Sequence, residues 1–118
     1  SAFHLSLRVS YPNAFDLERA EEDGRHRPGS DIMIHGGTAS AGCLAMGDET
    51  AEDLFVMAAL TGPANVEVIL SPCDLRVKQF LPPANAPVWT ARLYQALETK
   101  MKALPPALKS SQHPPKKP

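Results

Sequence analysis

Residues 32–48 form the sequence IMIHGGTASAGCLAMGD, and this stretch decides how the chain is organised. Its first residues alternate around two isoleucines, which predicts a short strand over 31–35 that ends at His35. The next eight positions, 36–43, hold only small residues, so they cannot supply a hydrophobic core and predict a loop. Cys43 closes this loop. The segment therefore predicts a strand and a glycine-rich loop that carry an imidazole and a thiol.

These two groups suit nucleophilic chemistry. A thiol attacks a carbonyl carbon as the thiolate, which forms when a neighbouring imidazole such as that of His35 takes the proton. Glycines at 36, 37 and 42 permit positive φ and let a substrate approach the backbone. The N–H groups of Gly42 and Cys43 predict an oxyanion hole for acyl transfer. The alternative is that Cys43 is a small hydrophobic residue without chemistry.

The sequence before this segment predicts one strand and one loop. Apolar residues at every second position of 2–11 indicate a half-buried strand. The alternation places His4 on the polar face of that strand and Tyr11 on its core face. Many charges with glycine and proline over 16–30 then predict an exposed loop.

The sequence after Cys43 predicts a helix, a strand and a second helix. The first helix spans 50–60, with Thr50 and Asp53 as a capping box and a stop at Gly62-Pro63. The strand covers 66–70, and the second helix covers 88–103, before Pro105-Pro106. The apolar faces of the two helices are predicted to be Ala51, Leu54, Phe55 and Ala58, and Trp89, Leu93, Ala96, Leu97 and Met101.

The whole chain limits the class of protein. Its 118 residues suit one domain, with 105–118 as a Pro/Lys-rich disordered tail. The formal net charge is -1, from 12 basic and 13 acidic residues, so it favours neither nucleic acid nor a membrane surface as partner. No apolar run approaches the roughly 18 residues that a membrane span needs.

The second cysteine is interpreted as structural. Cys73 follows Pro72 and has no histidine near it in the sequence. A disulfide between Cys43 and Cys73 would block the nucleophile, so we expect the two thiols not to be paired. Their spacing fits no zinc pattern, and we expect no metal site.

A family resemblance sharpens these expectations. His35-Gly36 followed by Ser40-Ala41-Gly42-Cys43 resembles the HG…S-x-G-C signature of the L,D-transpeptidase catalytic domain, the YkuD-like family. The continuation to Asp48 and the upstream residues 3–16 are similar to its YafK-like branch. The similarity covers residues 2–76 and extends more weakly into the second predicted helix.

The resemblance implies a mainly β fold with flanking helices, of the α+β class, that works on peptidoglycan stem peptides in the periplasm or the cell wall. Cys43 would be the nucleophile and His35 the base and then the acid, with the imidazole oriented by the carbonyl of Gly36. No metal or cofactor takes part. The remaining site residues that it implies are Ser40, Ala41 and Gly42 in the loop, and His4 and Tyr11 in the substrate cleft.

Two departures from the family pattern leave alternatives open. Many members carry Arg two residues after the cysteine, where this chain has Ala45. Hydrolysis of the same class of bond therefore competes with transpeptidation. The strands that usually precede this region are absent, so residues 1–104 are interpreted as an N-terminally truncated catalytic domain. A non-catalytic peptidoglycan-binding domain is the alternative of another class.

Overall fold

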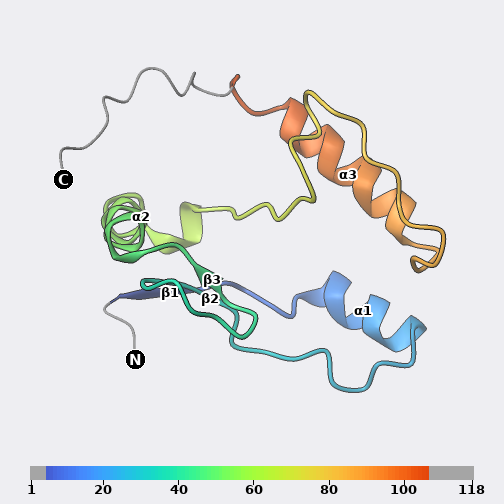
Figure 1. Cartoon of the computed structure of the whole chain (residues 1–118), viewed down its shortest axis with the longest axis horizontal. Coiled ribbons are helices and arrows are strands. Elements are labelled where there is room, and N and C mark those ends of the chain that lie inside the picture. The colour runs from blue at the N-terminus through green and yellow to red at the C-terminus, as the bar shows by residue number, and fades with distance from the viewer. Residues whose placement is uncertain (1–4, 107–118) are drawn as a thin grey trace. The chain divides into compact units, whose positions relative to one another are not determined.

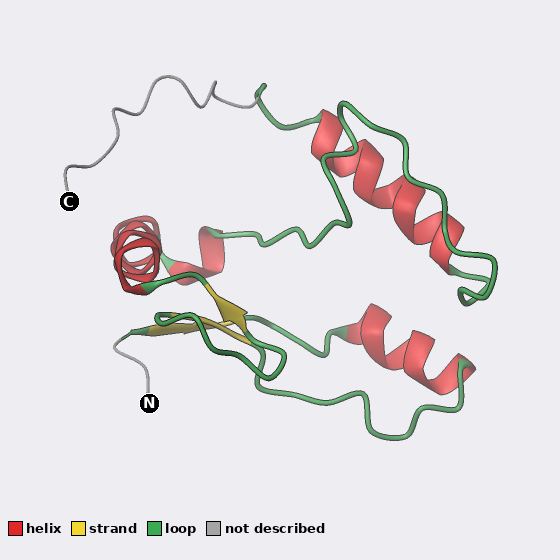
Figure 2. Ribbon diagram, viewed as in Figure 1, coloured by secondary structure: helices red, strands yellow, loops and turns green. Residues whose placement is uncertain are grey.

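The computed structural model describes residues 5–106, over which the chain forms an α+β structure of three helices and a three-stranded mixed sheet (Figures 1 and 2). It divides into two compact units, 1–68 and 69–118. Helical residues outnumber strand residues, so the described part is less rich in β-structure than expected. The elements are β1 (Ser6–Arg8), α1 (Ala14–Glu22), β2 (Met33–His35), β3 (Leu44–Ala45), α2 (Asp48–Thr61), the short 3-10 helix η1 (Pro63–Asn65) and α3 (Thr90–Lys102).

The sheet of the first unit has the order β1-β2-β3. β1 runs antiparallel to β2, with Ser6 opposite His35, and β3 runs parallel to β2, with Ala45 beside His35. Residues paired across strands point to the same face of a sheet. Leu7, Ile34 and Leu44 therefore share one face, and His35 points to the other. The predicted strand at 31–35 is confirmed as β2, whereas β3 was not predicted.

The predicted loop over 16–30 is wrong in its first part, because α1 occupies residues 14–22. Asn13 caps this helix: its side chain accepts a hydrogen bond from the Asp16 N–H at 3.0 Å. The Asp16 carboxylate accepts in return from the Asn13 N–H at 2.9 Å. This capping box starts the helix. The predicted strand over 2–11 is shorter than expected, since β1 holds three residues, and residues 1–4 lie outside the described part.

The predicted helix over 50–60 is confirmed as α2, which lies over one face of the sheet (Figure 1). The predicted capping box of Thr50 and Asp53 is wrong. The helix starts at Asp48 after Gly47 (φ 75°), so Thr50 lies inside its first turn. The stop is confirmed, with Gly62 (φ 88°) at the C-terminal cap. Its buried residues are Ala51 and Ala58, while Leu54 is half-buried and Phe55 exposed.

The predicted strand over 66–70 is wrong. These residues follow η1 as an extended segment without strand structure, and Val66, Val68 and Leu70 are exposed. Alternating apolar residues form a strand only where a neighbouring backbone completes the ladder. Among the described residues, none pairs with this segment.

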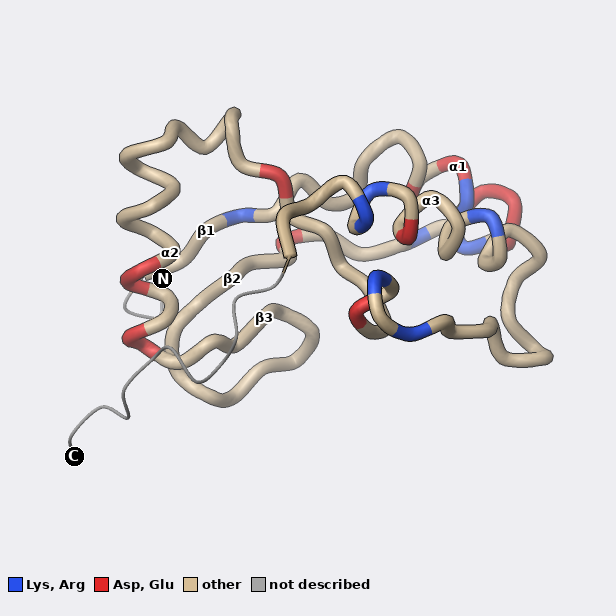
Figure 3. The backbone as a smooth tube through the Cα atoms, turned by 90° about the horizontal axis from the view of Figure 1, so that it is seen from above, with Lys and Arg blue, Asp and Glu red and all other residues tan. Residues whose placement is uncertain are grey.

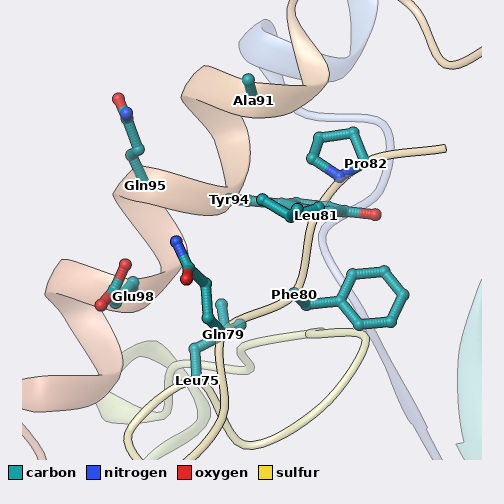
Figure 4. A pocket seen from close by; sticks show the side chains of 9 residues that line it. All are labelled: Leu75, Gln79, Phe80, Leu81, Pro82, Ala91, Tyr94, Gln95 and Glu98. Carbon is teal, nitrogen blue, oxygen red and sulfur yellow. The ribbon is translucent and has the colours of Figure 1, made fainter. Parts of the chain in front are cut away.

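The second unit is built on α3, which confirms the predicted helix over 88–103. Its half-buried residues include Leu93, Leu97 and Met101 of the predicted stripe, while Ala96 is exposed. The Phe80 ring packs edge-on against Tyr94, with centroids 5.7 Å apart. The two rings lie in the lining of a small pocket of about 120 Å³ between α3 and the preceding loop (Figure 4).

Arg76 links the loop before α3 to the residues after it. Arg76 donates to both Asp74 carboxylate oxygens at 2.9 Å and to the Pro105 carbonyl at 2.6 Å. The side-chain hydrogen bonds from Arg76 hold the pKa of Asp74 below its ordinary value of 3.8. The same bonds raise the pKa of Arg76. The folded chain therefore keeps the Asp74 carboxylate ionised at lower pH than the unfolded chain does.

This linkage makes stability depend on pH in a defined window. A carboxyl group whose pKa is lower in the folded chain stabilises the fold when the pH is above its pKa in the unfolded chain. This stabilisation is lost as the pH falls through the pKa that the group has in the folded chain. We expect Asp74→Asn to lower the urea midpoint of unfolding at about pH 7, and to lower it less at about pH 2, because protonation of the Asp74 carboxylate in the wild-type chain removes its contribution. Urea unfolding at the two pH values tests this. An equal loss at both would show that the carboxylate charge is not the cause.

No helix within residues 5–106 combines the length and the apolar character that crossing a membrane requires.

Candidate active site

His35 is the largest fully buried side chain of the described residues, with 2% of its surface exposed. It ends β2, where pairing on both sides holds its backbone. Its Nδ1 atom lies 2.6 Å from the carbonyl oxygen of Gly36. A carbonyl oxygen only accepts hydrogen bonds, so Nδ1 donates and carries the proton. In the neutral ring the Nε2 atom is therefore the one able to accept a proton.

Cys43 is half-buried and directly precedes β3. Its thiol donates to the carbonyl of Asp31 at 3.4 Å. Asp31 has a positive φ of 57°, in the left-handed region that aspartate tolerates better than most residues. Its carboxylate forms an ion pair with Arg8. The thiol is thus held toward the residues that precede β2, by a weak hydrogen bond.

The strand register points to a common face for His35 and Cys43, although Cys43 itself lies one residue before β3. Ile34 pairs with Leu44, and His35 with Ala45. Continuing this parallel register by one residue places Cys43 beside Met33, two positions from His35. Residues two apart on a strand share a face.

The loop between the two residues is ordered by Ser40. The Ser40 hydroxyl donates to the carbonyl of Cys43 at 2.6 Å and accepts from the N–H of Gly42 at 3.1 Å. The N–H of Gly42, expected in the oxyanion hole, is therefore engaged inside the loop. Gly42 has a φ of 129°, and Ala41 beside it is exposed.

Gly36 was expected to adopt a positive φ, but the structure shows that its lack of a side chain matters instead. Gly37 (φ 70°) and Gly42 adopt positive φ, whereas Gly36 does not. Gly36 is buried, and a Cβ atom at this position would collide with the Asp48 carboxylate. That carboxylate accepts from the N–H of Gly37 at 2.9 Å. The glycine thus allows the start of α2 to lie directly against the residue after His35.

The other predicted site residues lie as follows. Tyr11 is half-buried, and its hydroxyl donates to the Pro28 carbonyl at 2.6 Å, so it ties two loops of the first unit together. His4 lies outside the described residues. Cys73 is half-buried with a free thiol, as Cys43 is, and belongs to the second unit. Within residues 5–106, no three His, Cys, Asp or Glu side chains gather as a metal site would require.

Three residues beside the site were not predicted from the sequence. Ser6 lies opposite His35 in the ladder, the Asp31 carbonyl accepts from the thiol, and Asp48 holds the loop at Gly37. The alternation of β1 puts Ser6 on its polar face, but only the register shows which residue it meets. Asp31 and Asp48 act through contacts 12 and 11 residues away, for which local patterns carry no signal.

In comparisons with known proteins, no family model, no curated protein and no solved structure matches this chain.

Proposed function

We propose that the chain carries out cysteine-dependent acyl transfer on peptidoglycan stem peptides, as an L,D-transpeptidase of the periplasm or cell wall with the YkuD-like fold. The observation that carries the proposal is the 2.6 Å contact between His35 Nδ1 and the Gly36 carbonyl. It leaves Nε2 as the ring nitrogen that can accept a proton, and the parallel register of β2 and β3, continued by one residue to Cys43, supports a common face for the two side chains. The sequence signature from His35 to Cys43 supplies the substrate class.

The first half-reaction forms a thioester. His35 Nε2 removes the thiol proton of Cys43, and the thiolate attacks the carbonyl carbon between an L-centre and a D-residue. The N–H of Cys43 is the proposed oxyanion donor, because that of Gly42 is bonded to Ser40. The tetrahedral intermediate then breaks its C–N bond. Protonated His35 gives its proton to the departing amine, and the acyl group stays on Sγ.

The second half-reaction releases the acyl group. An amine of another stem peptide gives up a proton to His35 and attacks the thioester carbonyl. The C–S bond breaks, the new amide forms, and the Cys43 thiolate recovers the proton from His35. Atoms and charges balance over the cycle, and no electron transfer is involved.

The proposal requires one side-chain movement. The thiol of Cys43 leaves the Asp31 carbonyl, 3.4 Å away, and turns toward His35 by rotation about its Cα–Cβ bond. A thiol is a weak hydrogen-bond donor, so little stabilisation is lost.

Hydrolysis is the second candidate, and one observation favours it. Ala45, which stands where many members of the proposed family carry Arg, pairs directly with His35. Its methyl group supplies no charge beside the imidazole to hold an acceptor peptide. Water would then take the acyl group from Cys43 in place of an amine.

Product analysis of muropeptides tests the proposal. We expect the chain to convert purified muropeptides, and Cys43→Ala to leave them unchanged in mass spectra. Cys73→Ala is the matched control, since it removes the other half-buried thiol and is expected to retain conversion. New cross-linked masses indicate transpeptidation, and cleavage products alone indicate hydrolysis. If the folded wild-type chain converts nothing, or Cys43→Ala converts as fast, the proposal fails and a non-catalytic peptidoglycan-binding role takes its place.

A further inference from the structure

The formal net charge of -1 is the sum of two large and opposite charges. Residues 1–68 contain 4 Lys and Arg against 11 Asp and Glu, a net charge of -7. Residues 69–118 contain 8 against 2, a net charge of +6. The whole-chain value therefore hides a division of charge between the two units. The basic second unit has a field of one sign that attracts anions.

The acidic residues of the second unit leave its excess charge uncompensated. Asp74 is paired with Arg76 at 2.9 Å, and Glu98 with Lys102 at 2.6 Å. Both carboxylates of the unit are thus already engaged inside it. The remaining basic residues are spread along the unit, and those within the described part appear in Figure 3. They include Lys78 and Arg92, and in the sequence after residue 106 also Lys109, Lys116 and Lys117.

The second unit also exposes apolar side chains. The loop over 77–88 contains Val77, Leu81 and Val88, whose exposed fractions are 83%, 74% and 93%. Lys78 lies in the same loop and is also exposed. Binding to a hydrophilic polyanion would not remove these apolar side chains from water, so they would gain no free energy from it. The surface of an anionic bilayer offers both headgroup charge and an acyl boundary.

We infer that the second unit binds peripherally to anionic lipid bilayers. Exposed basic side chains, Lys78 and Arg92 among them, contact the headgroups, and Val77, Leu81 and Val88 enter the boundary between headgroups and acyl chains. The first unit, with its charge of -7, is repelled by such a surface, so the binding is assigned to the second unit alone. The inference does not depend on the proposed catalytic function, and its test has no catalytic readout.

Vesicle co-sedimentation with the full chain tests the inference. We expect binding to vesicles of phosphatidylglycerol with phosphatidylcholine, and none to phosphatidylcholine alone. Raising the salt from about 50 mM to about 500 mM should release the chain. Lys78→Glu with Arg92→Glu, two exposed positions, should weaken binding by roughly tenfold or more, because each basic residue near the surface contributes about 1 kcal/mol. Leu81→Asn with Val88→Asn should weaken it as well.

The matched control is Arg25→Glu with Arg27→Glu, which makes the same change in net charge at exposed positions of the first unit. It should leave vesicle binding unchanged, and circular dichroism should show all variants folded. The inference is overturned if anionic vesicles are not bound at low salt, or if both charge-reversal pairs weaken binding equally. It is also overturned if the asparagine pair binds as well as wild type while soluble polyphosphate competes fully, since the partner would then be any polyanion.

Discussion

Replacement of His35 by glutamine is expected to slow the Cys43-dependent conversion of muropeptides by about a hundredfold to ten-thousandfold, the usual effect of losing a general base. Glutamine keeps an N–H that can donate to the Gly36 carbonyl, now 2.6 Å from Nδ1, but offers no nitrogen that accepts a proton. The rate of muropeptide conversion measures the effect.

A second readout separates the loss of the base from damage to the fold. In the wild-type chain at mildly acidic pH, iodoacetamide should alkylate Cys43 faster than Cys73, because the imidazole assists only the former. In His35→Gln the rate at Cys43 should fall and the rate at Cys73 should stay constant. Peptide mapping reports both thiols in one sample. Equal alkylation of the two cysteines in the wild-type chain, unchanged in the variant, would contradict the role assigned to His35.

Replacement of Gly36 by alanine is expected to lower the free energy of unfolding by about 1 to 3 kcal/mol, the range for losing a hydrogen bond to a charged group. A Cβ atom at residue 36 collides with the Asp48 carboxylate. The carboxylate can turn away only by releasing the N–H of Gly37, which it holds at 2.9 Å. Urea unfolding followed by circular dichroism measures the change.

A double-mutant cycle isolates the cause of that loss. Asp48→Ala removes the same hydrogen bond and should cost a similar amount. The double variant should then cost little more than either single variant, because the carboxylate that collides is already gone. Additive losses would mean that Gly36 is needed for some reason other than Asp48.

Local patterns predicted the elements whose signals lie within one segment. The alternation at 31–35 predicted β2, and the glycine at 62 predicted the end of α2. The predicted helix 88–103 became α3, where Leu93, Leu97 and Met101 are half-buried. These signals depend on each residue's own backbone preference and on helical or strand periodicity. They can therefore be recognised without knowing which other segment the element packs against.

One prediction failed although its signal was local: the charges in 16–30 indicated a loop, but the reciprocal bonds of Asn13 and Asp16, three residues apart, start α1. The strand predictions failed because they needed information from elsewhere in the chain. The alternation of 66–70 matched a strand, yet no described backbone pairs with it. β3 is two residues long and exists only because β2 lies beside it. Strand structure is a property of a pair, which a single segment cannot establish.

The sequence by itself determined which residues are candidates for chemistry: a histidine at the end of a strand, a cysteine eight residues later, and small residues between them. Only the tertiary structure decided how they are arranged. Parallel pairing of β2 and β3 puts Ala45 beside His35, only 2% of the His35 surface is exposed, and Asp48 packs against Gly36. The physical reason is that residue type and period are local, whereas register, burial and close approach depend on segments far apart in the chain.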